Sequence, residues 1–440
     1  MNQLNLPEFR VLKVEENEQK DLKFTVEAIR PIASCPECGN EDCYKHAPME
    51  RFVRDLNMFN QRVGIVVKGN RYKCKECGKT FTEQFHSIDD RDKITLRLKE
   101  HVMSISLKEP FAKIAETYAI SPTTVKRLFN EYVAKQEQTM IFETPRVLGI
   151  DEVHLNKQMR AVFTDIERLK VLEMLPKRNK KDVIKFLSQI PDIHKVEVVT
   201  TDMWQPYKDA TIETMPNAHL VIDKFHVLQY ANRALDSTRK AFKDSLTTKQ
   251  RRQLMRDRFV LLKNKEDLTV AEKMNRDIWF STFPTLRTAY YIKENLRDMY
   301  LCETKYQATE YFKVWKSSIP NDMKFFLEIA TIIDNWHTEI FNYFDHRVTN
   351  AFTESINNLI KHIEKRGRGY SFEVLRAKVL FGTNATIRPK YDKDNGYNRI
   401  GKITMNSFDF SNFDYSEPQL KEGFGVSVPQ LLNVIERDEF

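Results

Sequence analysis

Three carboxylates stand where the surrounding sequence predicts three different structural settings. Asp151 and Asp202 each end an apolar run, so we expect each at the end of a buried strand, whereas Glu354 lies in a stretch that predicts a helix. Together they could hold two Mg²⁺ ions, with Mn²⁺ as a substitute, because carboxylate oxygens are hard ligands. Such a pair would activate a water or a 3′-hydroxyl and stabilise a leaving oxygen, which is the chemistry of phosphodiester cleavage or transfer.

The segments around these acids predict the elements that would bring them together. From residue 147 to residue 223 the pattern predicts strands and helices in the order β-β-β-α-β-α-β, which is that of ribonuclease-H-like domains. In such domains the first and fourth strands are neighbours, so Asp151 and Asp202 would project at one edge of the sheet. An acid there is costly unless it is used. We therefore predict Asp151, Asp202 and Glu354 as catalytic residues and Mg²⁺ ligands.

Other polar residues near these positions compete for the same roles. Asp223 and His226 also follow a predicted strand, and we place them behind the metal ligands or in contact with DNA. Glu152 and His154 adjoin Asp151 and could take a minor part, although simple exposure would also explain them. Most of the 62 acidic residues must lie on the surface, so only the strand and helix context singles out the three.

Two C-x-x-C-G segments predict a metal site of a different kind. Each can form a tight turn that directs two thiolates at one ion, and two such turns complete a tetrahedral Zn²⁺ site. Strand-like sequence lies between them, as in a zinc ribbon. The predicted ligands of this structural zinc are Cys35, Cys38, Cys74 and Cys77. The nearby Cys43 and His46 could replace one ligand or hold a second ion, but we favour neither.

Residues 111–132 predict a helix-turn-helix. Ser121 is a good N-cap and Pro122 suits the first turn of the second helix. The helical spacing turns some side chains inward and others outward, toward the bases or phosphates of DNA. The inward set is Val125, Leu128 and Phe129. The outward set, our predicted DNA contacts, is Thr123, Thr124, Lys126 and Arg127. Any helical hairpin would share part of this pattern.

Composition agrees with a DNA-handling protein and excludes some other classes. The chain has 440 residues and a formal net charge of +8, and its last 35 residues hold seven acids against two basic residues. The rest is therefore more basic still, which suits a polyanionic partner as well as ordinary solubility. No run approaches the roughly 18 apolar residues of a membrane helix. The start has no basic-then-apolar signal pattern, so we expect no export.

These patterns predict a multidomain α+β fold. It comprises a zinc ribbon, a helix-turn-helix and a ribonuclease-H-like α/β core with a mixed sheet that an all-helical insertion interrupts. Few helix breakers occur in that insertion, where Ile292, Leu296, Met299 and Tyr300 mark one apolar face. The predicted domains are 1–88 (hairpin and zinc ribbon), 89–142 (helix-turn-helix), 143–230 (first part of the core), 231–344 (insertion), 345–400 (second part with the Glu354 helix) and 401–440 (acidic tail).

Several segments together resemble the DDE transposases of bacterial insertion sequences, most closely the ISL-three group. The resemblance extends from the zinc ribbon to about Arg376. Its most specific parts are Gly149-Ile150-Asp151-Glu152, Thr201-Asp202-Met203-Trp204, Asp223-Lys224-Phe225-His226 and residues 350–361 followed by 365–370. The family's catalytic Asp, Asp and Glu fall on Asp151, Asp202 and Glu354. Its aspartate-x-x-histidine signature falls on Asp223 and His226.

The resemblance implies an enzyme that cuts double-stranded DNA at the ends of its own mobile element and joins the 3′-hydroxyls to target DNA. It also implies that Lys361 and Arg366 contact the DNA backbone, although solvated positions would explain them nearly as well. We expect a homodimer, because two DNA ends must be held together. We expect it in the bacterial cytoplasm, associated with the nucleoid and not with a membrane. Two alternatives are a DNA-binding regulator with a silent core and a structure-specific nuclease that never joins strands.

Overall fold

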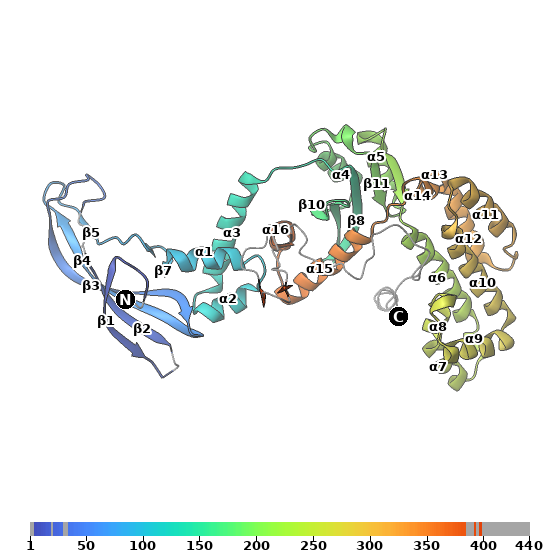
Figure 1. Ribbon diagram of the computed structural model, residues 1–440, viewed down its shortest axis with the longest axis horizontal. Coiled ribbons are helices and arrows are strands. Elements are labelled where there is room, and N and C mark those ends of the chain that lie inside the picture. Colours follow the sequence, from blue (N-terminus) through green and yellow to red (C-terminus); the bar gives the residue numbers. More distant parts are fainter. Residues whose placement is uncertain (1–3, 19–20, 30–33, 384–390, 393–395, 398–440) are drawn as a thin grey trace. The chain divides into compact units, whose positions relative to one another are not determined.

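The computed structural model describes residues 4–18, 21–29, 34–383, 391–392 and 396–397. Two compact units make up the chain. Unit 1 comprises Met1–Ile141 with His362–Thr386, and unit 2 comprises Phe142–Lys361 with Ile387–Phe440. Figure 1 shows the elements of each unit in the colours of the sequence. The predicted acidic tail, 401–440, lies outside the described residues.

A seven-stranded sheet forms the first part of unit 1. Its strands are β1 (Phe9–Glu16), β2 (Leu22–Ala28), β3 (Cys43–Met58), β4 (Gln61–Cys74), β5 (Thr80–Thr82), β6 (Ile88–Asp89) and β7 (Ile94–Thr95). The order is β1-β2-β4-β3-β7-β6, with β5 paired to β4. β1 and β2 pair antiparallel, which confirms the predicted hairpin, and the alternating apolar residues of β2 and β4 build one core.

Helices complete unit 1. They are α1 (Leu96–Ile105), α2 (Phe111–Tyr118), α3 (Pro122–Thr139) and α16 (Phe372–Thr383). The hydroxyl of Ser121 accepts a hydrogen bond of 3.0 Å from the backbone N–H of Thr124, so the predicted N-cap begins α3. Val125, Leu128 and Phe129 are buried in the core between α1, α2 and α3, as the helical spacing predicts.

The course of the chain after Lys361 differs from the predicted domain bounds. Residues 345–400 were expected to belong to the core, yet residues 362–386 group with unit 1. The reason is the apolar face of α16, because Val374 and Ala377 pack into the same core as α1 to α3. In addition, the ammonium of Lys378 donates to the carbonyl oxygens of Ser106 and Glu109.

Unit 2 contains a mixed five-stranded sheet. Its strands are β8 (Val147–Leu155), β9 (Gln158–Asp165), β10 (Lys170–Leu175), β11 (Val198–Thr201) and β12 (His219–Ile222). The order is β10-β9-β8-β11-β12, with β8, β11 and β12 parallel. The predicted neighbours, the first and fourth strands, are therefore confirmed. α4 (Lys180–Leu187), the short η1 (Ile193–Lys195) and α5 (Gln205–Thr214) connect the strands.

The segment that follows β12 is helical, as predicted for the insertion. Its α-helices are α6 (Lys224–Ala241), α7 (Thr248–Arg256), α8 (Arg258–Leu262), α9 (Val270–Thr282), α10 (Pro284–Asp298), α11 (Lys305–Ser317), α12 (Lys324–Asn335), α13 (His337–Phe341) and α14 (Tyr343–His346). Short 3-10 turns lie at η2 (Lys243–Ser245), η3 (Lys265–Asp267) and η4 (Met299–Leu301). Among the residues that the structure describes, no helix has both the length and the apolar composition needed to cross a bilayer.

One core holds the insertion helices together. Ile292, Leu296, Met299 and Tyr300 are buried in it, which confirms the predicted apolar face. Trp279 and Trp315 are buried too, and their indole N–H groups donate to Asp257 Oδ2 and to the carbonyl oxygen of Ile292. These two tryptophans are structural.

Helix α15 (Ala351–Gly367) returns the chain to the sheet. It approaches β8 closely because Gly149 has no side chain. A Cβ there would lie 2.4 Å from Thr164 Oγ1 and 2.7 Å from Thr353 Oγ1. Those two hydroxyls are hydrogen-bonded to each other at 2.6 Å, so the contact has no room for a larger residue. Two short strands, β13 (Tyr391–Asp392) and β14 (Gly396–Tyr397), pair antiparallel beyond it.

Candidate active site

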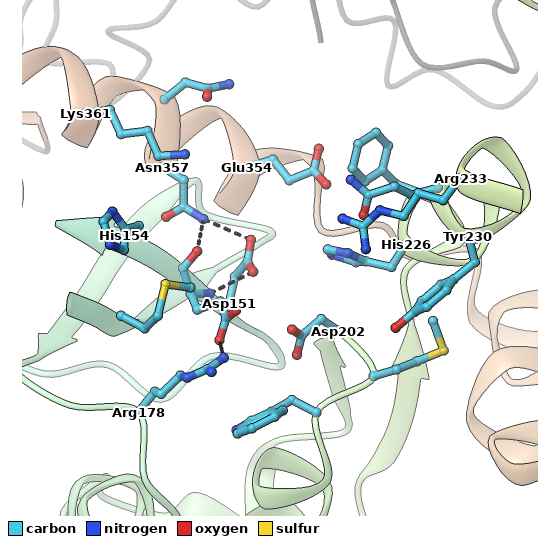
Figure 2. A pocket seen from close by; sticks show the side chains of 17 residues that line it. Asp151, His154, Arg178, Asp202, His226, Tyr230, Arg233, Glu354, Asn357 and Lys361 are labelled. Atoms are coloured by element: carbon cyan, nitrogen blue, oxygen red, sulfur yellow. Dashed lines mark hydrogen bonds and ion pairs between the residues drawn. The ribbon is translucent and has the colours of Figure 1, made fainter. Parts of the chain in front are cut away.

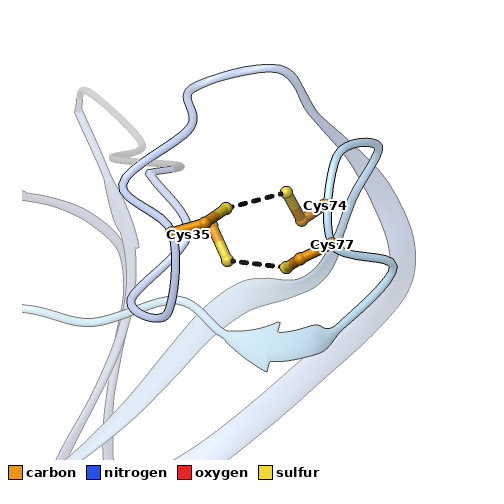
Figure 3. A group of neighbouring side chains, drawn as sticks. Cys35, Cys74 and Cys77 are labelled. Carbon is orange, nitrogen blue, oxygen red and sulfur yellow. Dashed lines mark hydrogen bonds between the residues drawn. The ribbon is translucent and has the colours of Figure 1, made fainter.

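The four cysteines of the C-x-x-C pairs form one cluster, part of which Figure 3 labels. The sulfur of Cys35 lies 3.5 Å from that of Cys77, and the sulfur of Cys38 lies 3.6 Å from that of Cys74. All four sulfurs lie within 4.8 Å of one another. Zn–S bonds of about 2.3 Å place tetrahedral sulfurs about 3.8 Å apart, so these residues fit a Zn²⁺ ion.

The turns that carry these cysteines have the same local structure. In each, the glycine after the second cysteine has a φ of +70° and donates its N–H to the carbonyl oxygen of the first cysteine. The backbone N–H of Cys77 helps to lower the pKa of Cys74 to about 7, which favours a thiolate ligand. Cys43 and His46 are outside the cluster. Cys43 instead donates to the carbonyl oxygen of Asn40, and His46 is exposed.

Two of the four predicted DNA contacts on α3 are exposed and two are engaged within the protein. Thr123 and Lys126 face solvent. The hydroxyl of Thr124 is hydrogen-bonded to the capping hydroxyl of Ser121. Arg127 differs most from its prediction, because its guanidinium is ion-paired with Asp92 and, at 3.3 Å, with Glu131. Arg127 therefore links α3 to the segment before α1 and is not freely available to DNA.

The three predicted catalytic carboxylates line one cavity of about 460 Å³ in unit 2 (Figure 2). The sheet explains two of them, since the register pairs Thr200 of β11 with Gly149 of β8. Two residues further along come Asp202, directly after the end of β11, and Asp151, which lies within β8 and not at its end as predicted, because β8 continues to pair with β9 as far as Leu155. The two acids therefore lie at the same level on neighbouring parallel strands. Glu354 enters from the first turn of α15.

Burial dominates the electrostatics of these acids. It raises the pKa of Asp151 to about 7 and that of Asp202 to about 6, while the nearby His226 opposes both shifts. Burial also raises the pKa of Glu354 to about 9, and the negative charges of Asp223 and Asp151 add to that shift. Each carboxylate is thus costly to ionise without a cation, which is typical of a functional site.

The structure separates the two supporting residues proposed from the sequence. Asp223 does not line the cavity: its Oδ1 accepts from the N–H of Phe225 at the start of α6, and its Oδ2 accepts from the N–H of Asn350 at 2.6 Å. It is a buried anchor. His226 does line the cavity, and its Nε2 is buried with no hydrogen-bond partner among the described residues.

Glu152 and Arg178 form an ion pair in the cavity wall. The guanidinium of Arg178 also lies 4.2 Å from the ring centre of Trp204. Glu152 raises the pKa of both Asp151 and Asp202, so it is a fourth acid of the same electrostatic group. His154 lines the cavity as well. Arg178 was not singled out in the sequence because it follows β10 with no distinctive pattern.

Asn357 is a site residue that the sequence reasoning missed. Its side-chain N–H donates to Asp151 Oδ2 at 2.9 Å and to the carbonyl oxygen of Glu152 at 3.2 Å. Its Oδ1 is buried and has no partner among the described residues. Helical spacing was the available signal, because Asn357 lies three residues after Glu354 and so on the same side of α15.

Asn350 was also missed, and it joins all three elements that carry the acids. The residue is fully buried directly before α15. Its side chain accepts from the hydroxyls of Thr200 at 3.2 Å and Thr353 at 2.6 Å, and it donates to the carbonyl oxygen of Ile150 at 3.4 Å. One carboxamide thus fixes β8, β11 and α15 to one another. The family-like segment 350–361 begins at this residue, but its role could not be predicted, since its partners are far apart in the chain.

The remaining predicted DNA contacts fall in different places. Lys361 lines the cavity, two helical turns beyond Glu354. Arg366 belongs to unit 1, and its guanidinium lies 3.3 Å from a carboxylate oxygen of Glu109.

Comparison with known families gives three matches along the chain. Residues 148–379 match a family described as "Transposase", of the ISL3 type. Residues 32–77 match the zinc-finger of transposase IS204/IS1001/IS1096/IS1165, and residues 83–133 match the helix-turn-helix domain of transposase family ISL3.

Curated proteins and solved structures give further likenesses. The chain is 23% identical to the transposase for insertion sequence element IS1001 of Bordetella parapertussis, over 84% of this chain and 94% of that protein. It is also 23% identical to the transposase for insertion sequence element IS1557 of Mycobacterium tuberculosis, over 86% of this chain and 92% of that protein. The catalytic core domain of BIV integrase is 15% identical and covers 29% of this chain and 88% of its own, but its TM-score of 0.16 is too low to support an argument.

The match to the transposase family spans more than half of the residues, and both N-terminal domains match modules of the same family. The helix-turn-helix and transposase domains imply binding to DNA. This chain therefore belongs to the ISL3 family of transposases.

Proposed function

We propose that this transposase binds the terminal inverted repeats of its insertion sequence, cleaves the DNA at those ends and joins the 3′-hydroxyls to target DNA. The observation that supports this most is the convergence of Asp151, Asp202 and Glu354 on one cavity, with the pKa of each raised. Such a set of hard oxygen ligands fits Mg²⁺, with Mn²⁺ as a substitute.

The arrangement favours two ions over one. Mg–O bonds of about 2.1 Å keep the ligands of a single ion within about 4.2 Å of one another. In the part of the chain that the structure describes, the four cysteines are the group of side chains placed to hold one ion, and the three acids do not form such a group. Asp151 affects the pKa of Glu354 and is affected by Asp202, whereas Glu354 is not among the main influences on Asp202. Asp151 is therefore electrostatically coupled to both of the other acids, Asp202 and Glu354.

Residues of the chain prepare the site in defined ways. Asn357 holds Asp151 Oδ2 and so fixes the carboxylate in one orientation. Lys361 adds a positive charge to a cavity wall that the DNA backbone would meet. When bound, the two cations would activate the attacking water or 3′-hydroxyl and stabilise the leaving oxygen. The cysteine cluster would hold one structural Zn²⁺.

The N-terminal modules would supply recognition of the element ends. On α3, Lys126 and Thr123 are the exposed side chains that could reach DNA. We further propose that the protein acts as a homodimer on the bacterial nucleoid, since two element ends have to be held for one insertion event.

Strand cleavage and joining on a duplex from the element end would test this function. Asp151→Asn, Asp202→Asn and Glu354→Gln each remove a metal-binding charge at nearly constant volume, so each should abolish cleavage and joining while DNA binding persists. Ser355→Ala, a change on α15 outside the cavity, is the matched control and should retain activity. Full activity of all three variants would reject the assignment. Binding without cleavage by the wild-type chain would point to a regulator, and cleavage without joining would point to a nuclease.

A further inference from the structure

The insertion carries an exposed basic surface on α7 that has no place in the chemistry described above. Lys249, Arg252 and Arg256 are spaced three and four residues apart, so they share one face of this nine-residue helix. All three are exposed, and Arg251 beside them is exposed too. The buried Leu254 lies on the opposite side and packs into the core of the insertion.

These charges are not neutralised within the protein. In the part of the chain that the structure describes, none of the four has an ion-pair or hydrogen-bond partner. Two exposed lysines of α11 do have acidic partners: Lys313 lies 2.7 Å from Glu310, and Lys316 lies 2.5 Å from Asp334. The nine residues of α7 include no acid. Asp257, which directly follows the helix, is buried and accepts from the indole of Trp279 at 2.8 Å, while the exposed Asp244 lies in the turn before it. The α7 surface is therefore uniformly positive.

Helix α6 connects the candidate active site to the α7 surface. α6 lines the cavity with His226 and Arg233 and then runs on toward α7 (Figure 1). Its 18 residues span about 27 Å at about 1.5 Å per residue. α8, which follows α7 directly, buries Leu261 and Leu262 in the same core as α6. Arg233, near the middle of α6, is itself exposed, so positive charge is also present along this path.

We propose that the α7 surface binds the phosphate backbone of the same DNA duplex whose cleaved phosphate occupies the cavity. The proposal rests on the proposed function. A rise of about 3.4 Å per base pair places the α7 contacts about eight base pairs from the cleavage point. Arginine and lysine side chains without internal partners suit contacts that hold DNA in register and do not read sequence. The insertion would thus bind the phosphate backbone of the duplex at a distance from the cleaved phosphate.

The salt dependence of DNA binding tests the proposal directly. The slope of log K against log salt is negative, and each lost phosphate contact reduces its magnitude by about 0.9, so Arg252→Gln combined with Arg256→Gln should reduce that magnitude by about 1.8. The pair Arg252→Lys with Arg256→Lys keeps the charges and should keep the slope. Lys313→Gln with Lys316→Gln is the matched control, since it removes two exposed charges from α11 of the same insertion and should leave the slope unchanged. An unchanged slope in the Gln pair, or an equal fall in the control, would overturn the proposal.

The length of the duplex provides the second readout. Element-end duplexes are shortened stepwise on either side of the cleavage point. With short duplexes, the difference in DNA affinity between wild type and the Gln pair should disappear. This should happen once fewer than about eight base pairs remain on the side that α7 binds. A difference that persists in the shortest duplexes on both sides would contradict the placement. If the wild-type chain binds but does not cleave, the proposed function fails while the slopes still decide the role of α7. If it cleaves while the Gln pair binds with the wild-type slope, the α7 proposal alone fails.

Discussion

The carboxamide of Asn357 donates to Oδ2 of Asp151 over 2.9 Å, and so joins α15 to the carboxylate at the centre of the candidate active site. The partner oxygen of the amide, Oδ1, remains without a hydrogen bond among the described residues. Both groups are buried. In the proposed function, helix α15 would therefore contribute twice: Glu354 as a metal ligand, and Asn357 as the residue that orients another ligand.

Replacement of this amide should damage metal use more than folding. We expect Asn357→Leu to lower the cleavage rate by about 10- to 100-fold and to raise the Mg²⁺ concentration that gives half-maximal cleavage, because a misoriented ligand binds metal less well. Cleavage measured over a Mg²⁺ titration checks this, alongside DNA affinity and thermal unfolding, which should change little. Ser355→Ala on the same helix is the control. A normal Mg²⁺ titration for Asn357→Leu would exclude the orienting role.

The cysteine cluster predicts a sharp difference between two cysteine substitutions. Cys38→Ser should abolish zinc binding, because it removes one of four sulfurs within 4.8 Å of one another, and it should open β3 and β4 near the cluster. Cys43→Ser should keep the zinc, because that sulfur lies outside the cluster. Metal analysis of the purified chains and hydrogen exchange of the amides in β3 and β4 provide the measurement. Equal zinc content in both variants would mean that the ligands are misassigned.

On α3, Lys126 and Arg127 should behave differently although they are adjacent. Lys126→Gln should reduce the magnitude of the slope of log K against log salt by about 0.9. It should leave the free energy of unfolding unchanged, because the side chain is exposed. Arg127→Gln should destabilise unit 1, because it breaks the ion pairs with Asp92 and Glu131. Salt-dependent binding and hydrogen exchange of α3 separate the two effects. The reverse pattern would place Arg127, and not Lys126, in the DNA interface.

Lys378 predicts a pH dependence in unit 1. Its ammonium lies against the rings of Phe111, Phe129 and Tyr370, and burial lowers its pKa to about 7. The positive charge of Arg366 adds to that shift, and the negative charge of Glu109 opposes it. The unfolded chain holds the same proton up to about pH 10, so it binds more protons than the folded chain between about pH 7 and pH 10.

The free energy of unfolding of wild type, measured relative to that of Lys378→Met, should therefore increase as the pH rises from about 7 to about 10. This gain should be lost as the pH falls through 7. Hydrogen exchange of the α16 amides across this range, compared between the two proteins, gives the measurement. Lys108→Met removes an exposed lysine of the same unit and should follow wild type at every pH. A constant difference between wild type and Lys378→Met would show that the amine keeps its proton.

Local patterns were sufficient for much of the architecture. The alternating hydrophobic residues of β8 and β11, the cap at Ser121 and the repeated C-x-x-C-G turns each depend on neighbours in sequence, so their structures could be predicted. The same holds for the order of the strands, which placed Asp151 beside Asp202. Arg127 shows the limit of that reasoning. Its exposure was inferred from helical spacing, but its partner Asp92 is 35 residues away in the chain.

Sequence by itself determined the residue types of this transposase: three acids proposed as metal ligands, four cysteines suited to zinc and a helical insertion between Asp202 and Glu354. Tertiary structure alone decided how those residues are held. Asn350 fixes three elements through one amide, Gly149 admits α15 by having no side chain, and Asp223 is a buried anchor that accepts from the backbone N–H of Asn350. The physical reason is that hydrogen bonds and close packing between distant segments depend on distances in space, which spacing along the chain does not specify.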